Sequence, residues 1–193
     1  MDTTLFFVIL FGHLASLILA FGSVLVIDVF GILWIFKKKT LSEIFKVAAV
    51  TQALIWIGWF GLIATGVPLL IMKGLVDELT LLKLFFVGLA GLNGLFLDRI
   101  KKEGEKIPDT ARPPARLIFR ISLGSAISQL SWWGATIVGF YHATVEHVVR
   151  WPQKPVLWMA GIVLAIAVVY ALGTFLFREK AKAAEPEKTD EPS

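Results

Sequence analysis

Long apolar runs separated by short charged segments make up most of this 193-residue chain. Five of the runs reach the length of about 20 mostly apolar residues that a helix needs to cross a bilayer. We therefore expect five transmembrane helices, over residues 5–36, 47–72, 79–97, 117–142 and 156–177. The remaining residues, 178–193, are charged and contain proline, which predicts a disordered tail.

Composition supports the same class of protein. The chain is 56% hydrophobic and its mean hydropathy is +0.75, which is more apolar than a soluble domain of this length. We expect an all-α, multi-pass integral protein of the inner or plasma membrane, folded as one five-helix bundle in the lipid bilayer.

Several kinds of chemistry are excluded by residues and motifs that the sequence lacks. The absence of cysteine excludes disulfides, thiolate metal sites, iron–sulfur clusters and covalently attached haem. The sequence also contains no P-loop, no H-E-x-x-H motif and no serine-nucleophile motif. If the protein is an enzyme, the class that remains is a membrane oxidoreductase.

The Lys and Arg residues predict the orientation. Most of the 19 basic residues lie after the first run, after the third run and in the tail. Loops rich in Lys and Arg face the cytoplasm, so we expect the N-terminus outside and the C-terminus in the cytoplasm. The net charge of +4 follows this topology and does not indicate a nucleic-acid partner.

Nitrogen-bearing side chains gather in the predicted outer half of the membrane. His13 lies in the first run, Lys83 opens the third, and His142 and His147 lie at and beyond the end of the fourth. A histidine inside a helical bundle can be an axial ligand of haem iron. We expect His13 to bind haem b, with His142 as the favoured second ligand and a neutral Lys83 as the reserve.

Two features of the fourth run bear on this haem site. A stripe of small residues leads to His142 along one helix face and offers room for a flat ligand, although such stripes also serve helix packing. Trp132 and Trp133 lie near the bilayer middle, where indoles pack beside an aromatic cofactor or simply fill a core. A copper-type metal site on His13 and His142, and a histidine proton relay, are the alternatives.

A second polar set lies in the predicted inner half. It consists of one residue from each of the first four runs: Asp28, Gln52, Asn93 and Arg120. Charged groups in a membrane face the bundle and find partners, so we expect Asp28 to pair with Arg120. The set is either a structural clamp or part of a transport or proton path.

Four stretches resemble a group of small membrane bundles that includes CopD-type copper-resistance domains and HemJ-type protoporphyrinogen oxidases. They are "FGHLASLILAFG", "LIATGVPLL", "LLKLFFVGLAGLNGLFL" and the basic loop after the third run. The resemblance implies haem b binding and activity at the early His and the third-run Lys, which are His13 and Lys83 here. The third run lacks further polar and aromatic residues of that pattern, and the fourth adds His142.

We therefore expect a haem b-binding membrane protein with an electron-transfer or redox role, served by a redox partner or quinone. The alternatives are a metal-ion, solute or proton transporter using His13, Asp28 and Arg120, and a structural membrane subunit. Whether the protein is a homo-oligomer is left open by the sequence.

Overall fold

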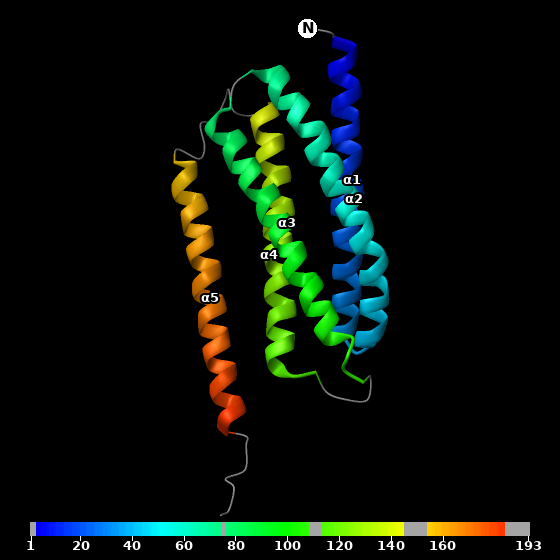
Figure 1. Cartoon of the computed structure of the whole chain (residues 1–193), viewed down its shortest axis with the longest axis vertical. Coiled ribbons are helices and arrows are strands. Elements are labelled where there is room, and N and C mark those ends of the chain that lie inside the picture. The colour runs from blue at the N-terminus through cyan, green and yellow to red at the C-terminus, as the bar shows by residue number, and fades with distance from the viewer. Residues whose placement is uncertain (1–2, 75, 109–112, 145–153, 184–193) are drawn as a thin grey trace, which may run out of the picture.

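The structure, a computed structural model, consists of five long helices (Figure 1). It describes residues 3–74, 76–108, 113–144 and 154–183. In chain order the helices are α1 (Thr3–Ile35), α2 (Leu41–Lys73), α3 (Glu78–Gly104), α4 (Ala115–Thr144) and α5 (Pro155–Ala183). The expected all-helical bundle of five helices is confirmed, and the described residues contain no strand.

Four of the helices are long and apolar enough to cross a membrane. They are Thr3–Ile35, Leu41–Lys73, Glu78–Gly104 and, within α5, Pro155–Phe177. α4 is as long as its neighbours but has no continuous stretch as apolar as theirs, because Arg, Ser, Gln and Thr residues interrupt its apolar sequence. The position of α4 as a fifth span and the orientation of the bundle therefore remain predictions.

Three helices extend beyond the predicted runs by six residues or more. α2 begins earlier, at Leu41, because Thr40 and Glu43 form a capping box in which each side chain bonds the other's backbone N–H. α3 continues past residue 97 to Gly104. α5 continues to Ala183, six residues beyond the predicted fifth run, and residues 184–193 lie outside the described residues, so the disordered tail stays a prediction.

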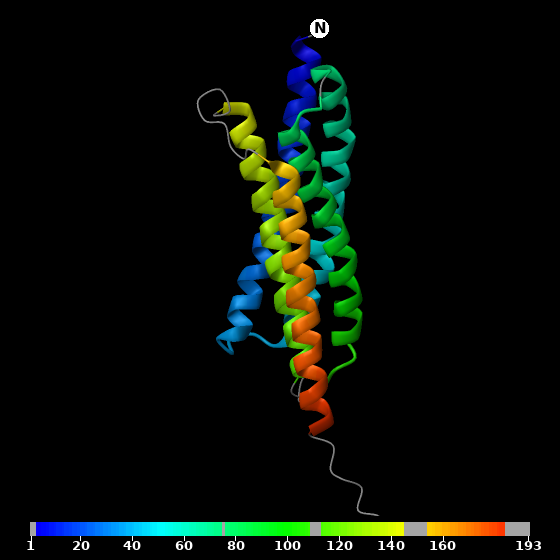
Figure 2. The same cartoon turned by 90° about the vertical axis from the view of Figure 1, so that its left-hand side faces the viewer.

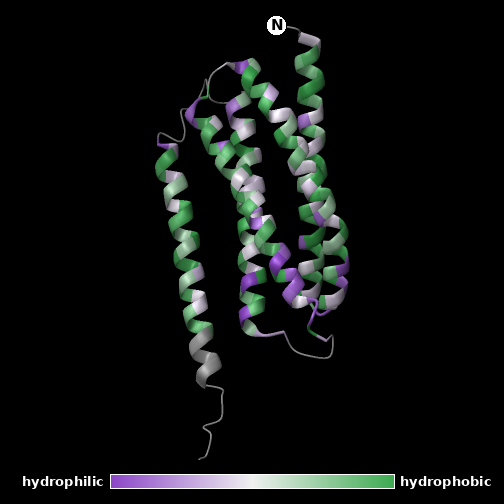
Figure 3. Cartoon of the chain, viewed as in Figure 1, coloured by the Kyte–Doolittle hydropathy of each residue, from purple (hydrophilic) through white to green (hydrophobic). Residues whose placement is uncertain are grey.

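The outer surface of the bundle is apolar. Phe11, Ile18 and Ile71 each expose more than 70% of their surface, and many other large apolar side chains also point outward. Figure 3 shows hydrophobic residues along most of the helix lengths and hydrophilic residues mainly near the helix ends. Exposed apolar surface of this extent is suited to lipid.

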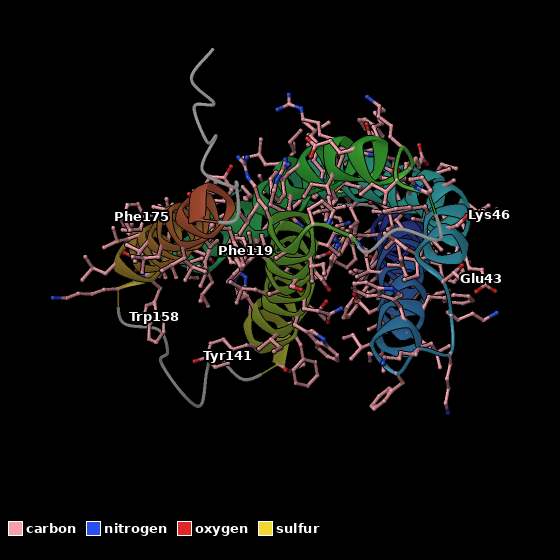
Figure 4. All side chains as sticks on the ribbon, turned by 90° about the horizontal axis from the view of Figure 1, so that it is seen from below. Glu43, Lys46, Phe119, Tyr141, Trp158 and Phe175 are labelled. Atoms are coloured by element: carbon pink, nitrogen blue, oxygen red, sulfur yellow. The ribbon has the colours of Figure 1, made fainter. Side chains whose placement is uncertain are left out.

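The bundle is built from two tight helix pairs, α1 with α2 and α3 with α4. A Cβ added at Gly58 of α2 would lie 2.6 Å from the backbone oxygen of Ser16, so the first pair packs backbone to backbone. Gly134 of α4 similarly accepts the ring of Phe86 from α3. α5 lies along the outside of α3 and α4 (Figures 1 and 2), and Phe119 lies between α4 and α5 (Figure 4).

The two pairs meet at mid-height through a small apolar core, the central cluster. It consists of the buried residues Ala20, Val24, Leu62 and Trp132. We call the end with the α1–α2 turn and Lys37, Lys38 and Lys39 the basic end (bottom of Figure 1). The other end, with the N-terminus and the α2–α3 connection, is the N-terminal end.

Candidate functional site

His13 projects from α1 in the half of the bundle near the N-terminal end, and its ring orientation is fixed by α2. Its Nδ1 lies 2.9 Å from Oγ1 of Thr65. The Thr65 hydroxyl donates its own proton to the backbone oxygen of Gly61 at 2.6 Å. Because that proton is committed, Thr65 accepts from His13, and the histidine is the Nδ1–H tautomer.

This tautomer leaves the lone pair on Nε2. The imidazole also has a hydrogen bond to the backbone oxygen of Leu62, on the same helix turn as Thr65, and no hydrogen bond or ion pair within the described residues is assigned to Nε2 of His13. The ring lies close to α2 at Gly66, which has no side chain, and a Cβ added there would be 3.3 Å from Cε1 of His13. An imidazole whose Nδ1 is held by a hydroxyl can use Nε2 to ligate haem iron or another metal.

Lys83 is the other nitrogen group that the structure places near His13. It is half-buried on α3, and its alkyl chain runs past Gly139 of α4. It lies within electrostatic range of both His13 and Asp77. Within the described ranges, its amine has no hydrogen bond and no ion pair. His13 and Lys83 thus offer two uncommitted nitrogens from the two helix pairs.

His142 does not join them. Its Nε2 lies 2.7 Å from Oδ2 of Asp77 and 2.6 Å from Nζ of Lys73, in a polar group at the α2–α3 connection. Either contact occupies Nε2 of His142. The sequence-based preference for His142 as the second ligand is therefore not supported by this geometry. His147 lies outside the described residues.

Asp77 holds this polar group together. It caps α3 by accepting from the backbone N–H of Thr80 at 2.7 Å, and it pairs with Lys73 at 2.9 Å. Burial alone would raise the pKa of Asp77, but the hydrogen bonds from Thr80 and Lys73 and the charge of His142 outweigh it and hold the pKa well below its ordinary value. Asp77 therefore stays ionised.

Trp132 and Trp133, the two tryptophans predicted to lie near a cofactor, differ in burial. Trp132 is buried in the central cluster and stacks on Phe21 with ring centroids 6.2 Å apart. Trp133 exposes 47% of its surface and meets the same phenylalanine edge-on. The small-residue stripe of α4 is largely occupied by α3: Leu97 packs on Gly124, and Lys83 packs beside Gly139. The contacts of Trp132 and of the small-residue stripe are therefore mainly packing contacts between helices.

The predicted pair of Asp28 and Arg120 is wrong. Asp28 accepts from Oγ of Ser125 at 2.8 Å and from Nε2 of Gln129. Arg120 pairs with Glu103 of α3 and lies over the ring of Phe96. Ser125 and Gln129 are four residues apart on α4 and so share a face, and this spacing is a signal in the sequence for a pair of donors facing one acceptor.

The other two residues of the predicted inner set, Gln52 and Asn93, have separate partners. Gln52 donates to Asp98 at 3.2 Å and accepts from Lys101 at 2.8 Å. Asn93 donates to the backbone oxygen of Gly124 at 2.8 Å. The central cluster separates this set from His13, so a transport path from His13 to Asp28 would have to open buried apolar packing.

Within the described residues, protein side chains alone do not form a binding site for a metal ion. In the part of the chain that the structure describes, no group of three or more His, Asp or Glu side chains is placed to hold one. Haem differs because the porphyrin supplies four ligands to its iron, and one or two protein nitrogens complete the set. No protein-family model, curated protein or solved structure matches the chain.

Proposed function

We propose that this chain is a haem b-binding membrane protein with an electron-transfer or redox role. His13 is the axial ligand through Nε2, and Lys83 replaces His142 as the second ligand. The observation that carries the proposal is the hydrogen bond between His13 and Thr65, which fixes the tautomer and leaves Nε2 uncommitted. The resemblance of the His13 and Lys83 stretches to HemJ-type proteins is consistent with this choice.

The donor set suits haem better than free copper. Two nitrogens from different helix pairs are enough for an iron that already carries a porphyrin, whereas the described residues offer no third ligand for a bare ion. Haem would supply reversible one-electron transfer. The protein would orient the imidazole through Thr65 and surround the site with apolar helix faces that exclude water.

Lys83 ligates only as the neutral amine, so binding through it releases a proton. Acidification should therefore favour the form in which Lys83 has left the iron and only His13 remains. The expected sign is a low-spin spectrum at high pH that becomes high-spin as the pH falls. A site with two histidine ligands would not change spin state over the pH range in which Lys83 takes up its proton.

Spectra of four proteins test the proposal. The wild type, His13→Ala, Lys83→Met and His142→Ala are expressed with ample haem supply and purified, and their oxidised and reduced spectra are recorded. We expect a Soret band in the wild type, its loss in His13→Ala, and a change from low to high spin in Lys83→Met.

His142→Ala is the matched histidine control, because its ring is committed to Asp77 and Lys73. It should keep the wild-type spectrum. A folded wild type without a chromophore, or a spectrum that depends on His142 and not on Lys83, overturns the proposal.

A further inference from the structure

A cavity of about 170 Å³ lies between the two helix pairs, on the basic-end side of the central cluster. Its wall is mainly apolar and includes three indoles, those of Trp34, Trp56 and Trp132. Trp34, Leu41 and Phe45 also line a surface groove at the basic end, so cavity and groove adjoin. We call this space the basic-end cavity.

Asn93 presents an unsatisfied acceptor in this cavity wall. The residue is 5% exposed, and its Nδ2 donates to the backbone oxygen of Gly124 at 2.8 Å. A backbone carbonyl only accepts, so the orientation of the amide is fixed. Its Oδ1 is buried and has no hydrogen-bond partner in the described residues. Buried polar atoms are nearly always paired, so this one calls for a donor from outside the chain.

Asp28 lines the same cavity and is also an acceptor. The donors that reach its carboxylate, Ser125 and Gln129, are neutral. Within the described ranges no basic side chain pairs with it. Lys101 lines the cavity as well, but its amine donates to Gln52 and lies 3.9 Å from Asp98. A carboxylate inside a membrane usually has a cationic partner.

We propose that the basic-end cavity binds a lipophilic organic amine, whose ammonium group pairs with Asp28 and donates to Oδ1 of Asn93. The apolar part of the ligand packs among the indoles, which also attract a cation over their faces. An apolar pocket with few convergent polar groups is the usual form of a small-molecule site. The central cluster separates this site from His13, so the proposal does not rest on haem binding.

A matched pair of probes tests the charge. 1-Naphthylmethylamine and 1-naphthylmethanol have the same apolar ring system, but one carries an ammonium and the other a neutral hydroxyl. Their binding to the full-length protein in lipid nanodiscs is measured by isothermal titration calorimetry. We expect the amine to bind at least tenfold more tightly than the alcohol.

Three variants assign the site. Asp28→Asn should remove the preference for the amine while leaving the affinity for the alcohol within about twofold. Glu103→Gln, which removes a carboxylate paired with Arg120 and outside the cavity lining, should keep the preference. Gly31→Leu should abolish binding of both probes. Gly31 lines the cavity and a Cβ added there meets nothing within 4 Å, so a side chain can be introduced at this wall without a clash at its Cβ.

Each contrary result overturns the proposal. Equal affinity for the two probes would make the ligand a neutral hydroxyl donor instead of an amine. Binding that survives Gly31→Leu would lie elsewhere, in lipid or on the surface. If Asp28→Asn does not fold, an amine preference that persists in Ser125→Ala with Gln129→Leu, and is lost in Gly31→Leu, still supports the assignment. If that double variant instead loses the preference, the ammonium group does not pair with Asp28 as proposed.

Discussion

Nδ1 of His13 donates to Oγ1 of Thr65 at 2.9 Å, and the hydroxyl of Thr65 in turn donates to the backbone oxygen of Gly61. This two-bond chain joins α1 to α2 and decides which ring nitrogen of His13 carries the proton. The hydroxyl of Thr65 is thus a positioning group for the proposed ligand, and it can be tested separately from the ligand itself.

Thr65→Val keeps the shape of the side chain and removes the acceptor. If His13 binds haem, this change should lower haem affinity by about 10–100-fold, the usual effect of losing a partner that orients a metal-bound histidine. Thr65→Ser retains the hydroxyl and should stay close to the wild type. Haem titration of the apoprotein gives the affinities, and equal affinities for Thr65→Val and Thr65→Ser would contradict the positioning role.

The carboxylate of Asp28 should be coupled energetically to Gln129 and not to Arg120. Polar contacts in membranes average about 0.6 kcal/mol, and hydrogen bonds to charged groups reach about 1.5–3 kcal/mol. A double-mutant cycle of Asp28→Ala and Gln129→Ala, measured by unfolding in detergent, should show a coupling energy of about 0.6–3 kcal/mol.

The matched cycle uses Asp28→Ala and Arg120→Gln. Since Arg120 pairs with Glu103, these two losses should add to within about 0.5 kcal/mol. Strong coupling between Asp28 and Arg120, with none to Gln129, would show that the structure assigns the wrong partner.

The close contact of α1 and α2 predicts opposite effects for two glycines. Gly58→Ala places a methyl group 2.6 Å from the backbone oxygen of Ser16, which cannot move aside without separating the helices. We expect a loss of about 1–3 kcal/mol in the free energy of unfolding. Gly22→Ala meets nothing within 4 Å and should be neutral or stabilising by up to about 1 kcal/mol. Thermal unfolding of both variants checks the order.

Asp77 should make stability depend on acidic pH. Its pKa is lowered in the folded protein, so its contribution is present above the unfolded value of about 3.9 and is lost as the pH falls below that value. Asp77→Asn should therefore be less stable than the wild type at pH 7, and the gap should narrow below about pH 4. A gap that is constant from pH 7 to pH 3 would mean that the carboxylate charge is not responsible.

Orientation can be measured directly because the chain has no cysteine. The distribution of Lys and Arg predicts the N-terminus outside and the C-terminus in the cytoplasm. In intact cells, an impermeant thiol reagent should label Thr3→Cys and not Ser193→Cys. After permeabilisation both should react, which controls for expression, and the reverse pattern in intact cells would invert the topology.

The sequence by itself determined the number and approximate position of the helices. The length of an apolar run and the turn signals at its ends act locally, so they are readable without knowing any neighbour. Even the early start of α2 was encoded locally, by Thr40 and Glu43. The run that proved less apolar, α4, is the one whose polar residues serve contacts with other helices.

Only the tertiary structure decided which polar groups meet. Asp28 accepts hydrogen bonds from Ser125 and Gln129 and does not pair with Arg120. His142 contacts Asp77 and Lys73 and does not join His13. Depth in the membrane follows from counting residues, and depth alone made the rejected pairs look plausible. A partner is chosen by helix rotation, tilt and neighbour order, which depend on close packing such as that of Gly58 against Ser16. That packing arises from the whole bundle, so no single helix sequence contains it.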